Sequence, residues 1–296
     1  MQRTQISAWL GVAPAWFVIG IFGVLPMLIM LGISFMVADP YGGVEPAYSH
    51  DAYIQFLFER DLDDSLIFNP IYLNIVLRSL GLAAITTVLC LIVGLPVAYF
   101  IARQPENRRD VLILLITIPF WTNLLIRTYA WILILTRNGV VDARLQSVGF
   151  EAGTFDLLYT NTAVLIGLVY SYLPFMVLPL YASLEKMDFR LVEAASDLYA
   201  NRWRAAWEVI LPLAKPGIVA GCLLVFVPSI GAFIAPDLLG GGKRMMLGSL
   251  IYFQFATARN WPFGAAVSIL LMAFVMLALL VYARVNKGQG LPAGGH

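Results

Sequence analysis

The sequence contains few charged residues. Only 12% of its 296 residues are Asp, Glu, Lys or Arg, whereas 60% are hydrophobic and the mean hydropathy is +0.81. Soluble proteins have about 25% charged residues, so this chain cannot cover a water-facing surface. An ordinary cytosolic protein and a disordered chain are therefore excluded, and a net charge of +1 excludes the basic face of a nucleic-acid-binding protein. The composition predicts an integral membrane protein.

Cysteine and histidine are also scarce. The two cysteines, Cys90 and Cys222, lie in apolar runs, and the two histidines, His50 and His296, lie outside them. This pattern resembles neither a disulfide framework nor a metal-binding Cys pair. We expect two small buried thiols, no metal site and no histidine-based catalysis within the membrane.

Sequence motifs of nucleotide binding and hydrolysis are missing. No G-x-x-x-x-G-K-[ST] motif occurs, because the tripeptide at 242–244 lacks both the preceding glycine and the hydroxyl residue. Neither G-x-S-x-G nor H-E-x-x-H is present, which gives no support to a membrane protease. We expect a chain without enzymatic activity and without a cofactor of its own.

Six apolar runs are each long enough to cross a bilayer core of about 30 Å. They are apolar on all sides, as membrane helices are, and do not alternate as barrel strands do. The expected fold class is an all-α polytopic membrane protein, with one transmembrane domain over 1–287 and a disordered tail over 288–296. The first run is too long for a signal peptide, so we expect an uncleaved span. The predicted spans are Leu10–Met36, Tyr72–Ala102, Val111–Leu135, Thr162–Leu184, Gly217–Ala235 and Phe263–Ala283.

The distribution of Lys and Arg predicts the orientation. With the N-terminus in the cytoplasm, eleven of these residues fall in inner segments and seven in outer segments. The segment Val37–Ile71 is then outside and acidic, and the segment Glu185–Pro216 is inside. We expect both termini in the cytoplasm.

The inner segment over 185–216 carries the clearest pattern. Asp188 is a suitable N-cap for a helix over Phe189–Leu198. On that helix Leu191, Ala195 and Leu198 form an apolar stripe. A second short helix is predicted over Trp203–Ile210, ending at Pro212. The helix either docks on another protein or lies on the membrane surface.

The sequence Glu193-Ala194-Ala195, followed at the family's spacing by Leu211-Pro212, resembles the EAA coupling loop of permease subunits of ATP-binding-cassette (ABC) importers. Tyr199 stands where that family has a glycine, and a left-handed tyrosine costs about 1–2 kcal/mol. Asn201 is an alternative residue for the turn. The resemblance implies that the residues contacting a separate ATPase are Glu193, Ala194, Ala195, Asp197, Leu198 and Tyr199.

Four further motifs resemble the permeases of spermidine/putrescine importers. The resemblance implies a polyamine as solute, a periplasmic solute-binding protein, a second homologous permease, and an ATPase dimer that binds the ATP and Mg²⁺. It also implies a location in the bacterial inner membrane. Another small amine, an opine or an organic solute could use the same machinery. Ala232 stands where polyamine permeases carry a glutamate, which weakens binding of a polycation. The motifs span Pro119–Trp131, Tyr172–Pro179, Ala235–Gly241 and Asn260–Ala266.

Arg127 lies within the third apolar run, where a charged residue costs about 2.5–3.5 kcal/mol on insertion scales. On a continuous helix, Asn123 and Arg127 share a face. This polar stripe is either a wall or gate of the solute path, or an anchor that pairs with a carboxylate or carbonyl of another helix.

Asp237 is the one acidic residue at the outer end of the fifth predicted span and is the best charged candidate for contact with a cationic solute. Trp121, Tyr129 and Tyr172 are candidates for cation–π contacts with that solute, or else anchors at the membrane interface. An ion-coupled secondary transporter is the rival function, but it needs a carboxylate or a broken helix within the membrane, and no predicted span has a central Asp or Glu. A scaffold that transports nothing would not need a polar third span.

Overall fold

The computed structural model describes residues 17–60, 63, 65–151 and 156–287. The chain divides into two compact units, one formed by Met1–Asn74 with Leu250–His296 and the other by Ile75–Ser249. The predicted disordered tail and the beginning of the first predicted span lie outside the described residues.

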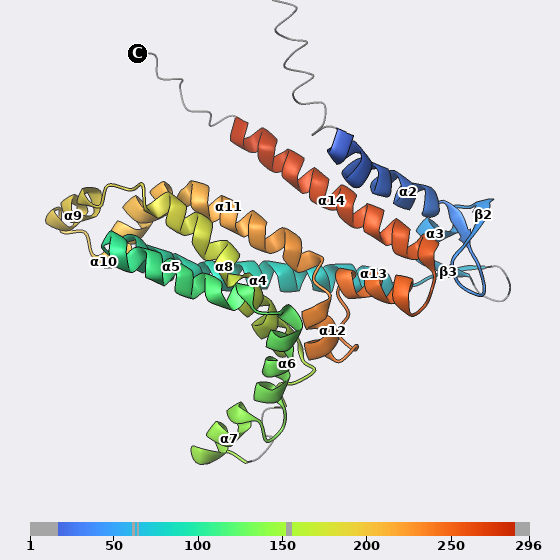
Figure 1. Cartoon of the computed structure of the whole chain (residues 1–296), viewed down its shortest axis with the longest axis horizontal. Helices are drawn as coiled ribbons and strands as arrows, with labels where there is room; N and C mark the ends of the chain where they lie inside the picture. Colours follow the sequence, from blue (N-terminus) through green and yellow to red (C-terminus); the bar gives the residue numbers. More distant parts are fainter. Residues whose placement is uncertain (1–16, 61–62, 64, 152–155, 288–296) are drawn as a thin grey trace, which may run out of the picture. The chain divides into compact units, whose positions relative to one another are not determined.

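In the first unit, two apolar helical segments pack together (Figure 1). The connection over 37–71, predicted as a loop, contains two small antiparallel strand pairs and one helical turn, so the mainly helical fold carries some β-structure here. The elements are η1 (Gly20–Val24), α2 (Leu25–Ile33), β1 (Met36–Ala38), β2 (Val44–Tyr48), α3 (Asp51–Ile54), β3 (Phe58–Arg60), β4 (Leu66–Phe68) and α14 (Trp261–Lys287).

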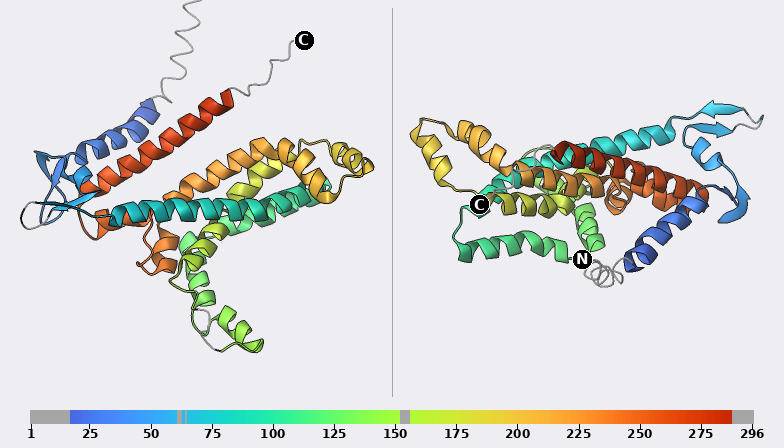
Figure 2. Two further views of the ribbon diagram at one scale, coloured as in Figure 1. Left: turned by 180° about the vertical axis from the view of Figure 1, so that it is seen from behind. Right: turned by 90° about the horizontal axis from the view of Figure 1, so that it is seen from above.

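The second unit is built around α4, α8 and α11. Helices α9 and α10 lie at one end of α8 and α11, and α12 lies at the other end (Figure 2). The elements are α4 (Ile71–Ala102), α5 (Glu106–Trp121), α6 (Leu124–Leu135), α7 (Val140–Ser147), α8 (Asn161–Leu184), α9 (Arg190–Asp197), α10 (Arg202–Ala205), η2 (Ala206–Ile210), α11 (Leu211–Ile230), α12 (Ile234–Gly240) and α13 (Leu247–Ala256), with α4 and α13 crossing the boundary between the units.

Five helical stretches of the described chain are long and apolar enough to cross a membrane. The described part of the first predicted span, Phe17–Ile33, is apolar but shorter. Helices α7 and α13 lie between predicted spans, in stretches for which no helix was predicted. The five stretches are Ile71–Ala102, Leu124–Ser147, Asn161–Leu184, Trp203–Ile230 and Trp261–Arg284.

The prediction of one continuous helix over Val111–Leu135 is wrong. Helix α5 ends at Trp121, and Thr122 adopts an extended backbone with ψ 150°. Asn123 then caps α6, because its side-chain oxygen accepts a hydrogen bond from the backbone N–H of Leu125 at 2.8 Å. This local hydrogen bond competes with helix continuation, which explains the break.

The predicted limits of the fifth span are also wrong. The short helix predicted over Trp203–Ile210 does not end at Pro212 but continues into the span, because α10, η2 and α11 follow one another without a break from Arg202 to Ile230. The wide π turn of η2, in which the Leu211 N–H donates to the Ala206 carbonyl, accommodates a proline that has no N–H. Gly231, which does not continue the helix, separates α11 from α12.

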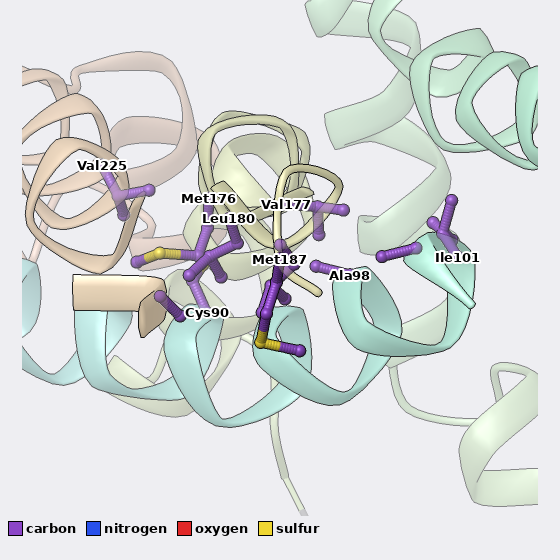
Figure 3. Close-up of a cluster of buried hydrophobic side chains, with 11 residues drawn as sticks. Cys90, Ala98, Ile101, Met176, Val177, Leu180, Met187 and Val225 are labelled. Atoms are coloured by element: carbon purple, nitrogen blue, oxygen red, sulfur yellow. The ribbon is translucent and has the colours of Figure 1, made fainter. Parts of the chain in front are cut away.

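Buried side chains of α4, α8 and α11 form the main core of the second unit (Figure 3). Cys90 of α4, Met176 and Leu180 of α8 and Val225 of α11 are each fully buried and meet there. Cys90 is thus a small buried thiol, as predicted, whereas Cys222 is only partly buried.

Two glycines allow α11 to approach α8 closely. A Cβ atom at Gly217 would lie 2.5 Å from the Pro179 carbonyl oxygen, and one at Gly221 would lie 2.7 Å from the Met176 sulfur. Gly217 and Gly221 are four residues apart and lie on one face of α11, the spacing of the small-residue motif of membrane helix pairs. A Cβ atom at Gly217 would meet the α8 backbone itself, whereas a side chain at Gly221 would first displace the Met176 side chain and, if large, the α8 backbone.

We therefore predict that Gly221→Leu destabilises the protein by about 1–3 kcal/mol, because it overpacks the contact between α8 and α11. The measurement is thermal unfolding of the detergent-solubilised protein. Gly81→Leu is the matched control, because no atom lies within 4 Å of a Cβ at Gly81. Equal midpoints for the two variants would contradict this packing.

Candidate functional site

Helix α9 contacts the core of the second unit through one face. Phe189 and Val192 pack against the main core, and the Phe189 ring lies 6.1 Å from the ring of Tyr99 on α4. The Asp188 carboxylate accepts a hydrogen bond from the Arg190 N–H at 3.0 Å, so Asp188 does cap the start of this helix. Phe189 lies between Asp188 and the first helical residue. Phe189 and Val192 were not predicted as contacts, although their spacing of three residues was visible in the sequence.

The opposite face of α9 is not covered by the chain. Leu191 and Ala194 are exposed, and Leu198 is 82% exposed at the C-terminal end of the helix. Glu193 and Asp197 are exposed beside this apolar surface. All six predicted coupling residues thus lie within α9 or in the two residues that follow it.

Tyr199 itself takes the left-handed conformation, with φ +61°. The Tyr199 N–H donates to the Ser196 carbonyl and the Ala200 N–H donates to the Ala195 carbonyl, both at 3.0 Å, which is the Schellman termination of a helix. The suggestion that Asn201 makes the turn is therefore wrong. Asn201 instead caps α10, because its side chain accepts a hydrogen bond from the Arg204 N–H at 2.8 Å.

The Tyr199 side chain is 98% exposed, so the strained backbone presents a whole aromatic ring on the protein surface. Trp203 and Trp207, one turn apart in the following helix, are also largely exposed. Large aromatic side chains without cover typically contact a partner protein or the membrane interface.

An ion pair joins the helix ends near α9. The Arg109 guanidinium lies 2.8 Å from the Glu185 carboxylate and reaches the carbonyls of Ala102 and Gln104 at 3.4 Å. Desolvation lowers the pKa of Arg109, but the hydrogen bonds to Glu185 and Tyr181 and their charges raise that pKa above its usual value. The ion pair connects the end of α4, the start of α5 and the end of α8.

The candidate path residues of the third predicted span lie around the break between α5 and α6. Trp121 is the last residue of α5 and is 82% exposed, and Asn123 is the cap of α6. Tyr129 is also exposed, on α6. Because Asn123 precedes the helix, its side chain is used for capping and does not extend a polar stripe from Arg127.

Arg127 belongs to α6, and its side chain reaches Tyr170 of α8. Its guanidinium lies 5.9 Å from the centre of the Tyr170 ring, and its Nε and Nη1 atoms are buried without a hydrogen-bond partner among the described residues. For these two nitrogens the predicted carboxylate or carbonyl partner is replaced by the face of an aromatic ring.

Tyr172 and Asp237 have different environments. The Tyr172 hydroxyl donates a hydrogen bond to the Pro228 carbonyl at 3.2 Å, which links α8 to α11. Asp237 is exposed, and it lies on α12 and not at the end of a membrane span. Helices α6, α8 and α12 pack against one another. The Arg127 N–H donates to the Asn123 carbonyl at 3.2 Å, a bond of the first turn of α6, but none of the side-chain hydrogen bonds or ring contacts among the described residues joins two of the six path candidates.

The family described as "Binding-protein-dependent transport system inner membrane component" matches residues 90–289, which include α9 and most of the second unit. The chain belongs to this family. It is thus a membrane component of a transport system, as the EAA-like sequence at Glu193–Ala195 indicated.

Curated relatives agree over nearly the whole length of the chain. The spermidine/putrescine transport system permease protein PotB of Salmonella typhimurium (strain SL1344) is 42% identical over 92% of this chain and 90% of its own length. PotB of Escherichia coli K12 is also 42% identical, over 92% of this chain and 94% of its own length. The inner membrane ABC transporter permease protein YdcU of the same organism is 32% identical over 76% of this chain and 75% of its own.

A solved structure supports the permease fold. A chain of a bacterial ABC transporter that imports the acidic polysaccharide alginate superimposes with a TM-score of 0.72. The match covers 96% of both chains at 15% identity, so it concerns the fold only.

We predict that Tyr199→Gly strengthens the turn after α9. Glycine removes the cost of a left-handed side-chain-bearing residue, about 1–2 kcal/mol. Exchange of the Ala200 amide hydrogen should slow by about fivefold or more, as measured by hydrogen–deuterium exchange of the peptide over 195–205. Tyr199→Ala keeps the penalty and is the control, and equal exchange in the two variants would show that the turn carries no strain.

Proposed function

We propose that this chain is the permease subunit of an ATP-driven ABC importer, and that α9 is the helix through which a separate ATPase dimer moves it. The observation that carries this proposal is the position of α9: one face rests on the core through Phe189 and Val192, and the other exposes Leu191, Ala194 and Leu198. A short helix that is fixed on one side and open on the other suits the transmission of a partner's movement.

The proposed complex contains further subunits. A second homologous permease completes the solute path, because the five crossing stretches of the described chain are few to enclose one alone. A periplasmic binding protein delivers the solute from the outer side, and both termini of this chain are in the cytoplasm. The ATPase dimer holds ATP and Mg²⁺, so this chain performs no covalent chemistry and needs no cofactor.

The mechanism follows from these positions. When ATP closes the ATPase dimer, α9 and the corresponding helix of the second permease approach each other and the path opens toward the binding protein. Hydrolysis releases the dimer and opens the path toward the cytoplasm. The ATPase can shift the balance between the outward-open and inward-open permease only by the difference between its binding free energies for the two states.

The proposed solute is a polyamine such as spermidine or putrescine, as in the PotB relatives. Asp237, exposed on α12, is the acidic candidate for contact with such a cation. Trp121, Tyr129 and the surroundings of Arg127 are the candidates for the wall or gate of the path.

The role of α9 is tested by Glu193→Lys. Charge reversal on a docking surface costs several kcal/mol when it brings like charges together, so we expect the ATPase recovered with the tagged permease to fall about tenfold or more, and uptake with it. Asp110→Lys, which changes an exposed carboxylate near the start of α5, is the matched control and should retain the ATPase.

Normal uptake by the Glu193→Lys protein with no ATPase bound would refute the importer proposal and favour an ion-coupled transporter. Recovery of the ATPase with both variants would refute only the docking role of Glu193.

The solute contact is tested by Asp237→Asn. Because this carboxylate is exposed, its attraction for a cation is worth about 0.2–1 kcal/mol, so we expect the apparent KM for spermidine uptake to rise by about 1.4- to fivefold. The amount of bound ATPase should not change. Asp110→Asn is the control, and an unchanged KM in the Asp237 variant would remove this residue from the path.

A further inference from the structure

A groove separates α9 from the end of α4. It encloses about 660 Å³ and continues between α4 and the helix that starts at α10. Its lining is mostly apolar and includes Leu95 and Tyr99 of α4, Val192 of α9 and Ile210 of η2. The groove lies on the inner side of α9, away from Leu191 and Leu198, and Glu193 lies at the border between the groove and the uncovered face.

The position of the lining along the chain places the groove at the edge of the membrane. Seven of its twelve lining residues belong to Ile71–Ala102 or Trp203–Ile230, two stretches that are long and apolar enough to cross a bilayer. Arg103 directly follows the first stretch and Trp203 opens the second. Arginine and tryptophan are common at the ends of membrane spans, near the lipid headgroups. This lining therefore favours a groove that opens at that level, with Leu95 and Ile210 toward the apolar parts of the two stretches.

The charges of the lining are one cation and one anion. The Arg103 guanidinium lies 5.6 Å from the centre of the Tyr99 ring, a contact that holds it at the groove. Glu193 is the acidic residue of the lining. A guanidinium binds phosphate with paired, charge-assisted hydrogen bonds, and a carboxylate accepts hydrogen bonds from a primary ammonium group.

We propose that this groove binds one phospholipid with a zwitterionic, amine-bearing headgroup, phosphatidylethanolamine. Its phosphate lies at Arg103, its ammonium group at Glu193, and one acyl chain between α4 and η2. The lipid fills the space under α9 and supports that helix from the membrane side. The site goes beyond the proposed transport function and does not depend on which solute is carried.

The site is tested by native mass spectrometry of the full-length permease, purified with its accompanying subunits and titrated with phosphatidylethanolamine. We expect Arg103→Gln to weaken binding by about tenfold, the effect of losing a charged hydrogen-bonding partner. Ala206→Trp, which fills the groove, should abolish it. Arg108→Gln, at another exposed arginine, and Ala84→Trp, on an exposed part of α4, are the matched controls and should bind as the unaltered protein does.

A photo-crosslinking residue in place of Ile210 identifies the occupant directly. Capture of phospholipid in the intact complex supports the proposal, and capture of the ATPase or another subunit overturns it. Equal binding of phosphatidylglycerol or phosphatidylcholine would overturn the headgroup assignment, and unchanged binding by both groove variants would overturn the site. Because subunit recovery is measured separately, these outcomes are independent of whether the importer proposal holds.

Discussion

The close contact between α8 and α11 is the constraint on which the rest of the second unit depends. Gly217 and Gly221 bring the α11 backbone against Pro179 and Met176 of α8. Since α11 continues without interruption from η2 and α10, the same contact fixes where the segment after α9 enters the core. The end of α8 and the start of α11 therefore hold α9 between them, and its position follows from helix packing more than from the loop itself.

The sequence predicted the class of protein and most of the spans because apolarity all round a helix needs no tertiary information. It also located α9 to within a residue at each end, since Asp188 and the stripe of Leu191 and Leu198 are local signals. The pair Gly217 and Gly221 is also visible in the sequence as two small residues four positions apart. The sequence does not show which helix packs against this pair, so the contact with α8 could not be predicted.

The predictions that were wrong all concern helix ends and turns, where several local interactions compete. Apolarity continues through Thr122 and Asn123 and past Gly231, whereas the helices do not, because side-chain capping and glycine decide the helix ends locally. Pro212 has the opposite effect: a proline predicted to end a helix is accommodated by a π turn. Tyr199 adopts a conformation suited to glycine because the carbonyls of Ala195 and Ser196 gain their hydrogen bonds there. The sequence therefore indicated where these turns and helix ends lie, but not which local interaction decides the backbone conformation at each.

The uninterrupted helix over Trp203–Ile230 has a mechanical consequence. Its 28 residues correspond to a rod about 42 Å long. If such a rod tilts as a rigid body by about 5°, one end moves by about 4 Å relative to the other. The chain thus has a built-in lever arm, and its regular α-helical hydrogen bonding is interrupted at the π turn near its beginning and at Pro216 and Pro228. A small stroke at the end near α9 would be delivered at the opposite end, beside α12, as a displacement comparable to the width of a water molecule or a methylene chain.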